Sequence, residues 1–203
     1  IEEMEKAQRG KNLSETDVYL YPLGMALIFN AHQAVLAIGA KEKSVCFGFP
    51  YVDTLNILRK WGEGVLFLGH GDYSLLDKLE KDLEGGLRIA LLFCECPLNP
   101  LLKTPDLARI RKLADKYNFI VCVDETVGNF LNVHVLPFAD IVCSSLTKVF
   151  SGDLNVMAGL LILNPSLLWY NKLKNYFNES YEDLFWAEDA LYLERKSRDF
   201  AER

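Results

Sequence analysis

The most constraining feature of this sequence is an alternation between short apolar runs and longer amphipathic stretches. The runs are rich in Val, Ile, Leu and Phe and are apolar almost throughout, rather than at every second position. This pattern is typical of strands that are buried on both faces, as in a parallel sheet. The runs lie at 44–48, 64–68, 88–94, 119–123, 140–143 and 158–163.

The stretches between these runs show helix signals. A proline or a capping residue stands where each helix is expected to begin, and apolar residues recur at helical spacing. Strands that alternate with helices predict a doubly wound, mostly parallel α/β sheet with helices on both faces and right-handed crossovers. The expected helices, each with the residues that open it, are 22–38 (Pro22), 74–84 (Ser74 with Asp77), 105–118 (Pro105 and Asp106) and 165–177 (Pro165).

The chain changes character after residue 177. Asn178–Asp183 is typical of a turn, and 184–203 predicts a charged helix with few apolar anchors, of the kind that usually docks on another part of a protein. We therefore expect a domain over 1–177 with its core at about 18–165, followed by a linker helix over 178–203 that leads to a further, C-terminal domain.

Charge and hydropathy exclude several classes of function. The 203 residues include 22 basic and 28 acidic side chains, for a net charge of −6, and the basic residues form no cluster. This balance argues against nucleic acid as a partner. No run approaches the ~20 apolar residues of a membrane span, and the first residues lack the order of a signal peptide. We expect neither a membrane nor a nucleic-acid partner.

The cysteines indicate a reducing compartment. Their number, five, is odd, and most lie within apolar runs, which argues against a disulfide framework. Cys94 and Cys96 have no second Cys or His pair at zinc spacing, so we expect no metal site. The prediction is a cytoplasmic protein.

Chemically useful side chains come directly after the apolar runs. Asp124 follows one run, Ser145, Thr147 and Lys148 follow another, and Gly24 opens a helix after 19–21. The carboxyl ends of strands form the ligand-binding edge of an open α/β sheet. Hydroxyls, a lysine and a helix N-terminus suit a phosphate monoester, and a carboxylate in an apolar setting needs a cationic partner. A nucleophilic lysine would complete the protein's share of pyridoxal phosphate chemistry.

Each residue alone is more often a helix cap or a solvated side chain. Their joint occurrence at successive strand ends favours the cofactor. A dinucleotide-binding domain is disfavoured because no Gly-x-Gly-x-x-Gly follows a strand.

A resemblance to a known family supports this interpretation. The segments 95–100 (ECPLNP), 123–126 (VDET) and 145–148 (SLTK) resemble the core of the Cys/Met-metabolism pyridoxal-phosphate enzymes. The segments 47–54 (FGFPYVDT) and 150–153 (FSGD) resemble in particular the fungal branch of cystathionine γ-synthase. The resemblance implies the large domain of the aspartate-aminotransferase-like fold, called fold type I.

The resemblance also implies roles for individual residues. Lys148 would bind the cofactor covalently and move protons at the substrate's α and β carbons, and Asp124 would pair with the ring nitrogen. The other cofactor-binding residues would be Gly24, Met25, Ser145 and Thr147 at the phosphate, Asn99 near the phenolic oxygen, Thr126 near Asp124, and Phe47 stacked on the ring.

Several positions depart from the family pattern. Phe47 replaces a tyrosine, so its ring lacks the hydroxyl, for which Tyr51 is a candidate substitute. The other departures are Leu23, Glu125, Phe49-Pro50, and Asp153 with Asn155.

The implied activity is trans-sulfuration: γ-replacement of an O-acyl-homoserine by cysteine to give cystathionine. Small amino acids would be the substrates, and the protein would form a homodimer or homotetramer. Two alternatives remain open: a cystathionine β- or γ-lyase, and a non-catalytic interaction domain with the same fold.

Overall fold

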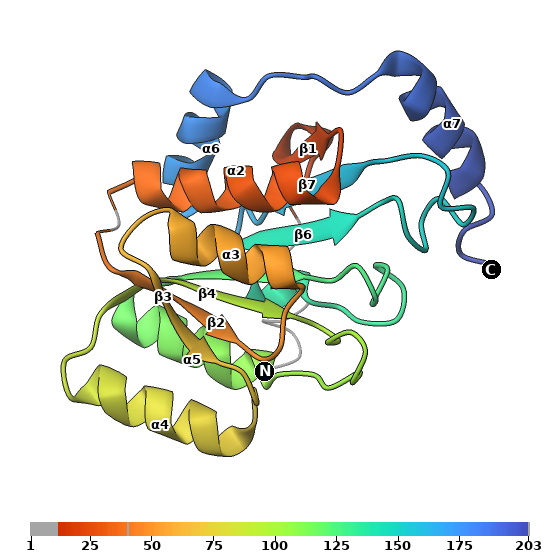
Figure 1. The fold of residues 1–203 in the computed structure, drawn as a ribbon. Helices are drawn as coiled ribbons and strands as arrows, with labels where there is room; N and C mark the ends of the chain where they lie inside the picture. Colours follow the sequence, from red (N-terminus) through yellow and green to blue (C-terminus); the bar gives the residue numbers. More distant parts are fainter. Residues whose placement is uncertain (1–11, 40, 203) are drawn as a thin grey trace.

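The computed structural model describes residues 12–39 and 41–202, and within this range it shows one mixed sheet (Figure 1). The order of the seven strands is β1-β7-β6-β5-β4-β2-β3, and β7 runs in the direction opposite to the other six. The predicted mostly parallel α/β sheet is therefore confirmed. The strands are β1 (Val18–Tyr21), β2 (Lys43–Phe47), β3 (Val65–Leu68), β4 (Ile89–Glu95), β5 (Ile120–Asp124), β6 (Ile141–Ser145) and β7 (Gly159–Leu163).

Helices cover both faces of this sheet, as expected. On one face α2, α3 and α6 pack through side chains such as Leu27, Leu58 and Phe177, and on the other α4 and α5 pack through Leu79 and Ile110 (Figure 1). Strands buried between two helical layers explain the wholly apolar runs. The helices are α2 (Gly24–Ala37), α3 (Val52–Lys60), α4 (Tyr73–Glu84), α5 (Leu107–Tyr117), α6 (Tyr170–Ser180) and α7 (Ala187–Ser197), with short 3-10 turns at Glu15–Asp17 and Leu136–Phe138.

Some expected boundaries are wrong. The cap of α4 is Asp72, which accepts a hydrogen bond from the Leu75 amide at 2.9 Å, and not Ser74. Helix α6 begins at Tyr170 rather than near Pro165 and continues to Ser180, into the expected turn. Helix α3 was not predicted, because it is only nine residues long and no capping side chain opens it.

The last helix has one buried apolar residue, Leu193, and this residue docks on the chain itself. Leu193 of α7 is buried against Leu146, Val156 and Ala158, which lie in and beside the segment that follows β6. The predicted helix 184–203 is shorter, 187–197, and residue 203 lies outside the described residues, as do 1–11 of the predicted domain.

The directions of the strands bring the predicted residues to one edge. Because β1 and β6 are both antiparallel to β7, they run in the same direction, and their last residues, Tyr21 and Ser145, both lie beside Gly159. A Cβ at Gly159 would lie 2.3 Å from Leu27 Cδ2, so glycine there allows the start of α2 to approach the sheet. No helix within the described ranges is long and apolar enough to cross a membrane.

Candidate active site at the carboxyl edge of the sheet

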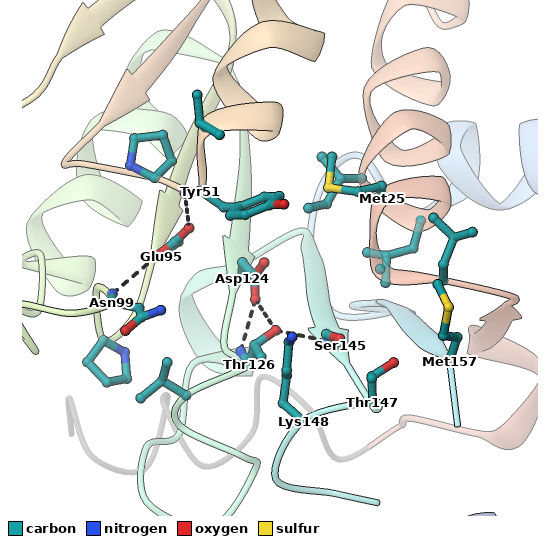
Figure 2. Close-up of a pocket in the computed structure, with 18 of the residues that line it drawn as sticks. Met25, Tyr51, Glu95, Asn99, Asp124, Thr126, Ser145, Thr147, Lys148 and Met157 are labelled. Atoms are coloured by element: carbon teal, nitrogen blue, oxygen red, sulfur yellow. Dashed lines mark hydrogen bonds between the residues drawn. The ribbon is translucent and has the colours of Figure 1, made fainter. Parts of the chain in front are cut away.

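A cavity of about 480 Å³ opens at this edge of the sheet (Figure 2). Its walls come from the start of α2, the turn before α3, the ends of β4, β5 and β6, and the segment after β6. All the predicted site residues except Phe47 line it: Gly24, Met25, Asn99, Asp124, Thr126, Ser145, Thr147 and Lys148. Among the described residues, no three His, Cys, Asp or Glu side chains gather as a metal site.

Phe47 lies elsewhere. Its side chain is 2% exposed and packs in the apolar layer beneath α4, with Leu68 and Leu76. The structure therefore does not bring Phe47 into the cavity with the other predicted residues. The aromatic side chains that line the cavity are Phe49 and Tyr51, and the Tyr51 ring lies above Asp124 in Figure 2.

The floor of the cavity is a hydrogen-bonded network at the ends of β5 and β6. The Asp124 Oδ1 atom accepts from the Thr126 amide at 2.9 Å and from its hydroxyl at 2.6 Å. The Thr126 hydroxyl in turn accepts from the Ser145 amide at 2.8 Å. These bonds lower the pKa of Asp124, but burial is the larger effect and raises it. The network orients the carboxylate, and a cation in the cavity would hold it ionised.

An anion cradle lies next to this network. Helix α2 begins at Gly24, and its first intrahelical backbone bonds come from Ala26 and Leu27, so no described residue accepts a hydrogen bond from the amides of Gly24 and Met25, which suit a ligand anion. A Cβ at Gly24 would stand 3.3 Å from Ser145 Cβ, which means that glycine preserves the space between the helix and β6. The Ser145 hydroxyl has no hydrogen-bond partner among the described residues.

Thr147 and Lys148 enter the cavity from the segment after β6. The Thr147 hydroxyl accepts from the Ala158 amide at 2.9 Å and contacts the Ala158 carbonyl oxygen at 3.4 Å. This hydroxyl therefore links the two ends of the segment 147–158. Its proton is only weakly hydrogen-bonded and remains available to an anion. The Lys148 side chain is exposed and extends into the cavity (Figure 2).

Glu95 is a site residue to which sequence reasoning assigned no role. Its side chain is 7% exposed, and its carboxylate accepts from the Tyr51 amide at 2.6 Å and from the Asn99 amide at 3.4 Å. It thereby holds the residue that precedes α3 and ties two loops that line the cavity. Burial raises the pKa of Glu95 to about 7, in part because Asp124 lies nearby. The sequence signal was its place at the end of an apolar run, the same position that Asp124 has.

Glu125 is buried directly behind the floor. Its side chain is 3% exposed, and burial, followed by the neighbouring Asp124 charge, raises its pKa to about 8. With a pKa of about 8, the Glu125 carboxyl is mostly protonated near neutral pH, so it adds little negative charge beside Asp124.

The side chains fit the cofactor that the resemblance implies. Asp124 presents its Oδ2 atom with no hydrogen bond from the described residues, which suits a protonated ring nitrogen. Gly24, Met25 and Ser145 present donors that no other described residue uses and that suit a phosphate, and Lys148 supplies an amine on the same cavity. The apolar side chains of Tyr51 and Met157 line the space where a ring would lie.

Comparisons with known proteins agree with this geometry. The sequence model described as Cys/Met metabolism PLP-dependent enzyme matches residues 5–195. A cystathionine gamma-synthase of Neurospora crassa is 57% identical over 198 residues, covering 95% of this chain and 32% of that protein. A cystathionine gamma-synthase of Saccharomyces cerevisiae is 50% identical over 209 residues, covering 93% of this chain and 33% of that protein.

Among solved structures, a cystathionine gamma-lyase from Lactobacillus plantarum superposes with a TM-score of 0.69 at 22% identity. The match covers 92% of this chain and 48% of that one, and it shows the shared fold. The chain thus spans about a third of the length of the curated relatives and about half that of the solved structure.

Proposed function

Because this chain belongs to the Cys/Met metabolism family of pyridoxal-phosphate-dependent enzymes, we propose that its cavity serves trans-sulfuration. The reaction would be γ-replacement, in which cysteine displaces the acyl group of an O-acyl-homoserine and cystathionine forms. One observation carries the proposal: Asp124, Ser145 and Lys148 line a single cavity in a chain 57% identical to a cystathionine gamma-synthase.

Pyridoxal phosphate, when bound, supplies an electron sink for negative charge at the substrate's α carbon. The residues of this chain bind and orient it. Asp124, held by Thr126, would keep the ring nitrogen protonated, while Gly24 and Ser145 would anchor the phosphate.

Proton transfer falls to Lys148. It is the side chain on this cavity that combines a flexible stem with an ionisable amine, so it can reach both the α and the β carbon. Tyr51 and Met157 would contribute to the walls of the cavity that holds the cofactor.

The direct test uses the full-length protein with an O-acyl-homoserine and cysteine. We expect cystathionine as the product, and loss of both turnover and the absorbance of the lysine-bound cofactor in Lys148→Ala. Release of thiol, ammonia and keto acid from cystathionine, without cystathionine formation, would instead indicate a lyase. Tight cofactor binding without turnover of either substrate would indicate a non-catalytic domain.

The same proposal includes self-association and a reducing compartment. Phe49, Tyr51, Val52 and Met157 line the cavity and are each more than half exposed, a concentration of apolar surface that suits contact with a second copy of the chain. We expect a homodimer or homotetramer, which light scattering of the full-length protein would show as a mass above that of one chain. All five cysteines are buried free thiols, which suits the cytoplasm.

A further inference from the structure

The segment that bears Lys148 is held from outside by α7. Leu146 and Ala158, at the two ends of this segment, are buried together with Val156 and with Leu193 of α7. Phe150 contacts Phe200, just beyond α7, with ring centroids 4.9 Å apart. In Figure 1, α7 lies beside the loops that leave β6 and enter β7. The helix is thus part of the support of the lysine segment.

Polar contacts fix the middle of the segment to the same helix. The Tyr192 hydroxyl donates to Asp153 Oδ2 at 2.9 Å and accepts from Asn155 Nδ2 at 2.7 Å. Lys196, one turn further along α7, forms an ion pair with the same Asp153 oxygen. A single phenol therefore joins two positions, Asp153 and Asn155, that depart from the family pattern.

The middle of the segment, 152–155, is exposed. Asp153 and Leu154 are exposed, and the segment has no regular secondary structure between β6 and β7. Its internal hydrogen bonds involve residues up to Gly152 and at Ala158: Thr147 contacts Ala158, the Ser151 hydroxyl donates to the Thr147 carbonyl oxygen at 2.8 Å, and the Gly152 amide donates to the Lys148 carbonyl oxygen at 3.2 Å. Loss of the contacts to α7 should therefore loosen 149–157 before it affects the sheet.

We propose that Tyr192 is a positioning residue for Lys148, acting through Asp153 and Asn155. This inference rests on the proposed function for the role of Lys148. Under this proposal, the orientation of α7 determines the position of the Lys148 amine. A partner that moves α7 would therefore alter the active site.

The test compares Tyr192→Phe, which keeps the ring and removes the hydroxyl, with Arg198→Ala as the matched control. Arg198 pairs with Glu194 on the same helix, with both side chains mostly exposed, and touches no residue of 149–157 in the contacts described. Hydrogen exchange of the cofactor-free, full-length protein gives the first readout. We expect exchange of amides 149–157 to accelerate about fivefold to tenfold in Tyr192→Phe, because one or two hydrogen bonds are lost. The exchange rates of amides in β4 and β5 should stay unchanged.

The second readout is the pH profile of the lysine-bound cofactor's absorbance. It should shift in Tyr192→Phe and not in Arg198→Ala, because a displaced amine meets a different charge environment. Leu193→Ala, which removes the buried anchor, should accelerate exchange of the same amides further. Equal exchange at 149–157 in all three variants, or acceleration spread evenly over β4 and β5, would overturn the inference.

Failure of the proposed function would look different. The unsubstituted protein would then take up no cofactor, while the exchange data would still decide whether Tyr192 restrains the segment.

Discussion

The two sides of the cavity are built in different ways. On the strand-end side, Asp124 and Ser145 are the last residues of neighbouring strands and Gly24 is the first of a helix packed on them. On the loop side, Tyr51, Asn99 and Lys148 belong to segments without regular structure, held by side chains from elsewhere. The register of the strands fixes the positions of the first set, whereas the positions of the second set depend on a few buried side-chain contacts.

The largest expected effect concerns the charge on the strand-end side. Asp124→Asn keeps the hydrogen bonds to Thr126 but removes the charge that a protonated ring nitrogen needs. We expect turnover of the full-length protein to fall about a hundredfold or more, since a charge-assisted hydrogen bond in a water-poor site is worth ~3 kcal/mol.

The control for this substitution is Asp82→Asn on α4, away from the cavity, which should leave turnover unchanged. Turnover of Asp124→Asn within threefold of the unsubstituted protein would remove Asp124 from the proposed chemistry.

On the strand-end side, the buried carboxyl of Glu125 also lowers the stability of the fold at high pH, and Glu125→Gln should reveal this effect. Because the folded-state pKa of Glu125 is raised from 4.5 to about 8, stability from this group is complete below about pH 4.5 and is lost as the pH rises through about 8. The glutamine variant should therefore gain ~1–3 kcal/mol at pH 8 and little at pH 4.5.

Denaturant unfolding across this pH range measures the difference, with the exposed Glu63→Gln as the control. A variant whose stability follows the same pH curve as the unsubstituted protein would show that Glu125 does not titrate in this window.

The loop side should respond to the loss of the Glu95 carboxylate, which holds its two loops together. Glu95→Ala leaves the Tyr51 and Asn99 amides without their acceptor, so both loops should move and affinity for pyridoxal phosphate should fall about tenfold. Glu95→Gln keeps an acceptor oxygen and should lose less.

Asp72→Ala provides a comparison, because the Asp72 carboxylate accepts a backbone amide at the start of α4, as the Glu95 carboxylate does just before α3, but Asp72 does not line the cavity. It should lower stability without changing cofactor affinity. Equal affinity in Glu95→Ala and Asp72→Ala would mean that the two loops hold their places without the tether.

The same division explains what could be predicted from the sequence. Asp124, Ser145 and Gly24 were predicted because the end of an apolar run indicates the end of a strand, and a helix signal indicates the first residue of a helix. The placement of Phe47 was missed because a strand residue at the end of β2 faces either the cavity or the core, and one position in register decides which. The docking of α7 was missed because its contacts join residues that are far apart in sequence, Asp153 and Tyr192 among them.

The smallest expected effect concerns the hydroxyls of Ser145 and Thr147, which have similar places in the sequence but different roles. Ser145→Ala removes a hydroxyl that has no partner among the described residues, so affinity for pyridoxal phosphate should fall about threefold to fivefold while the melting temperature stays the same. Thr147→Ala removes the acceptor of the buried Ala158 amide, so the melting temperature should fall as well. Calorimetry and cofactor titration of the two variants measure this difference. If Thr147→Ala unfolded at the same temperature as Ser145→Ala, the Thr147 hydroxyl would not be holding its segment, and the division between a strand-end side and a tethered loop side would fail at that residue.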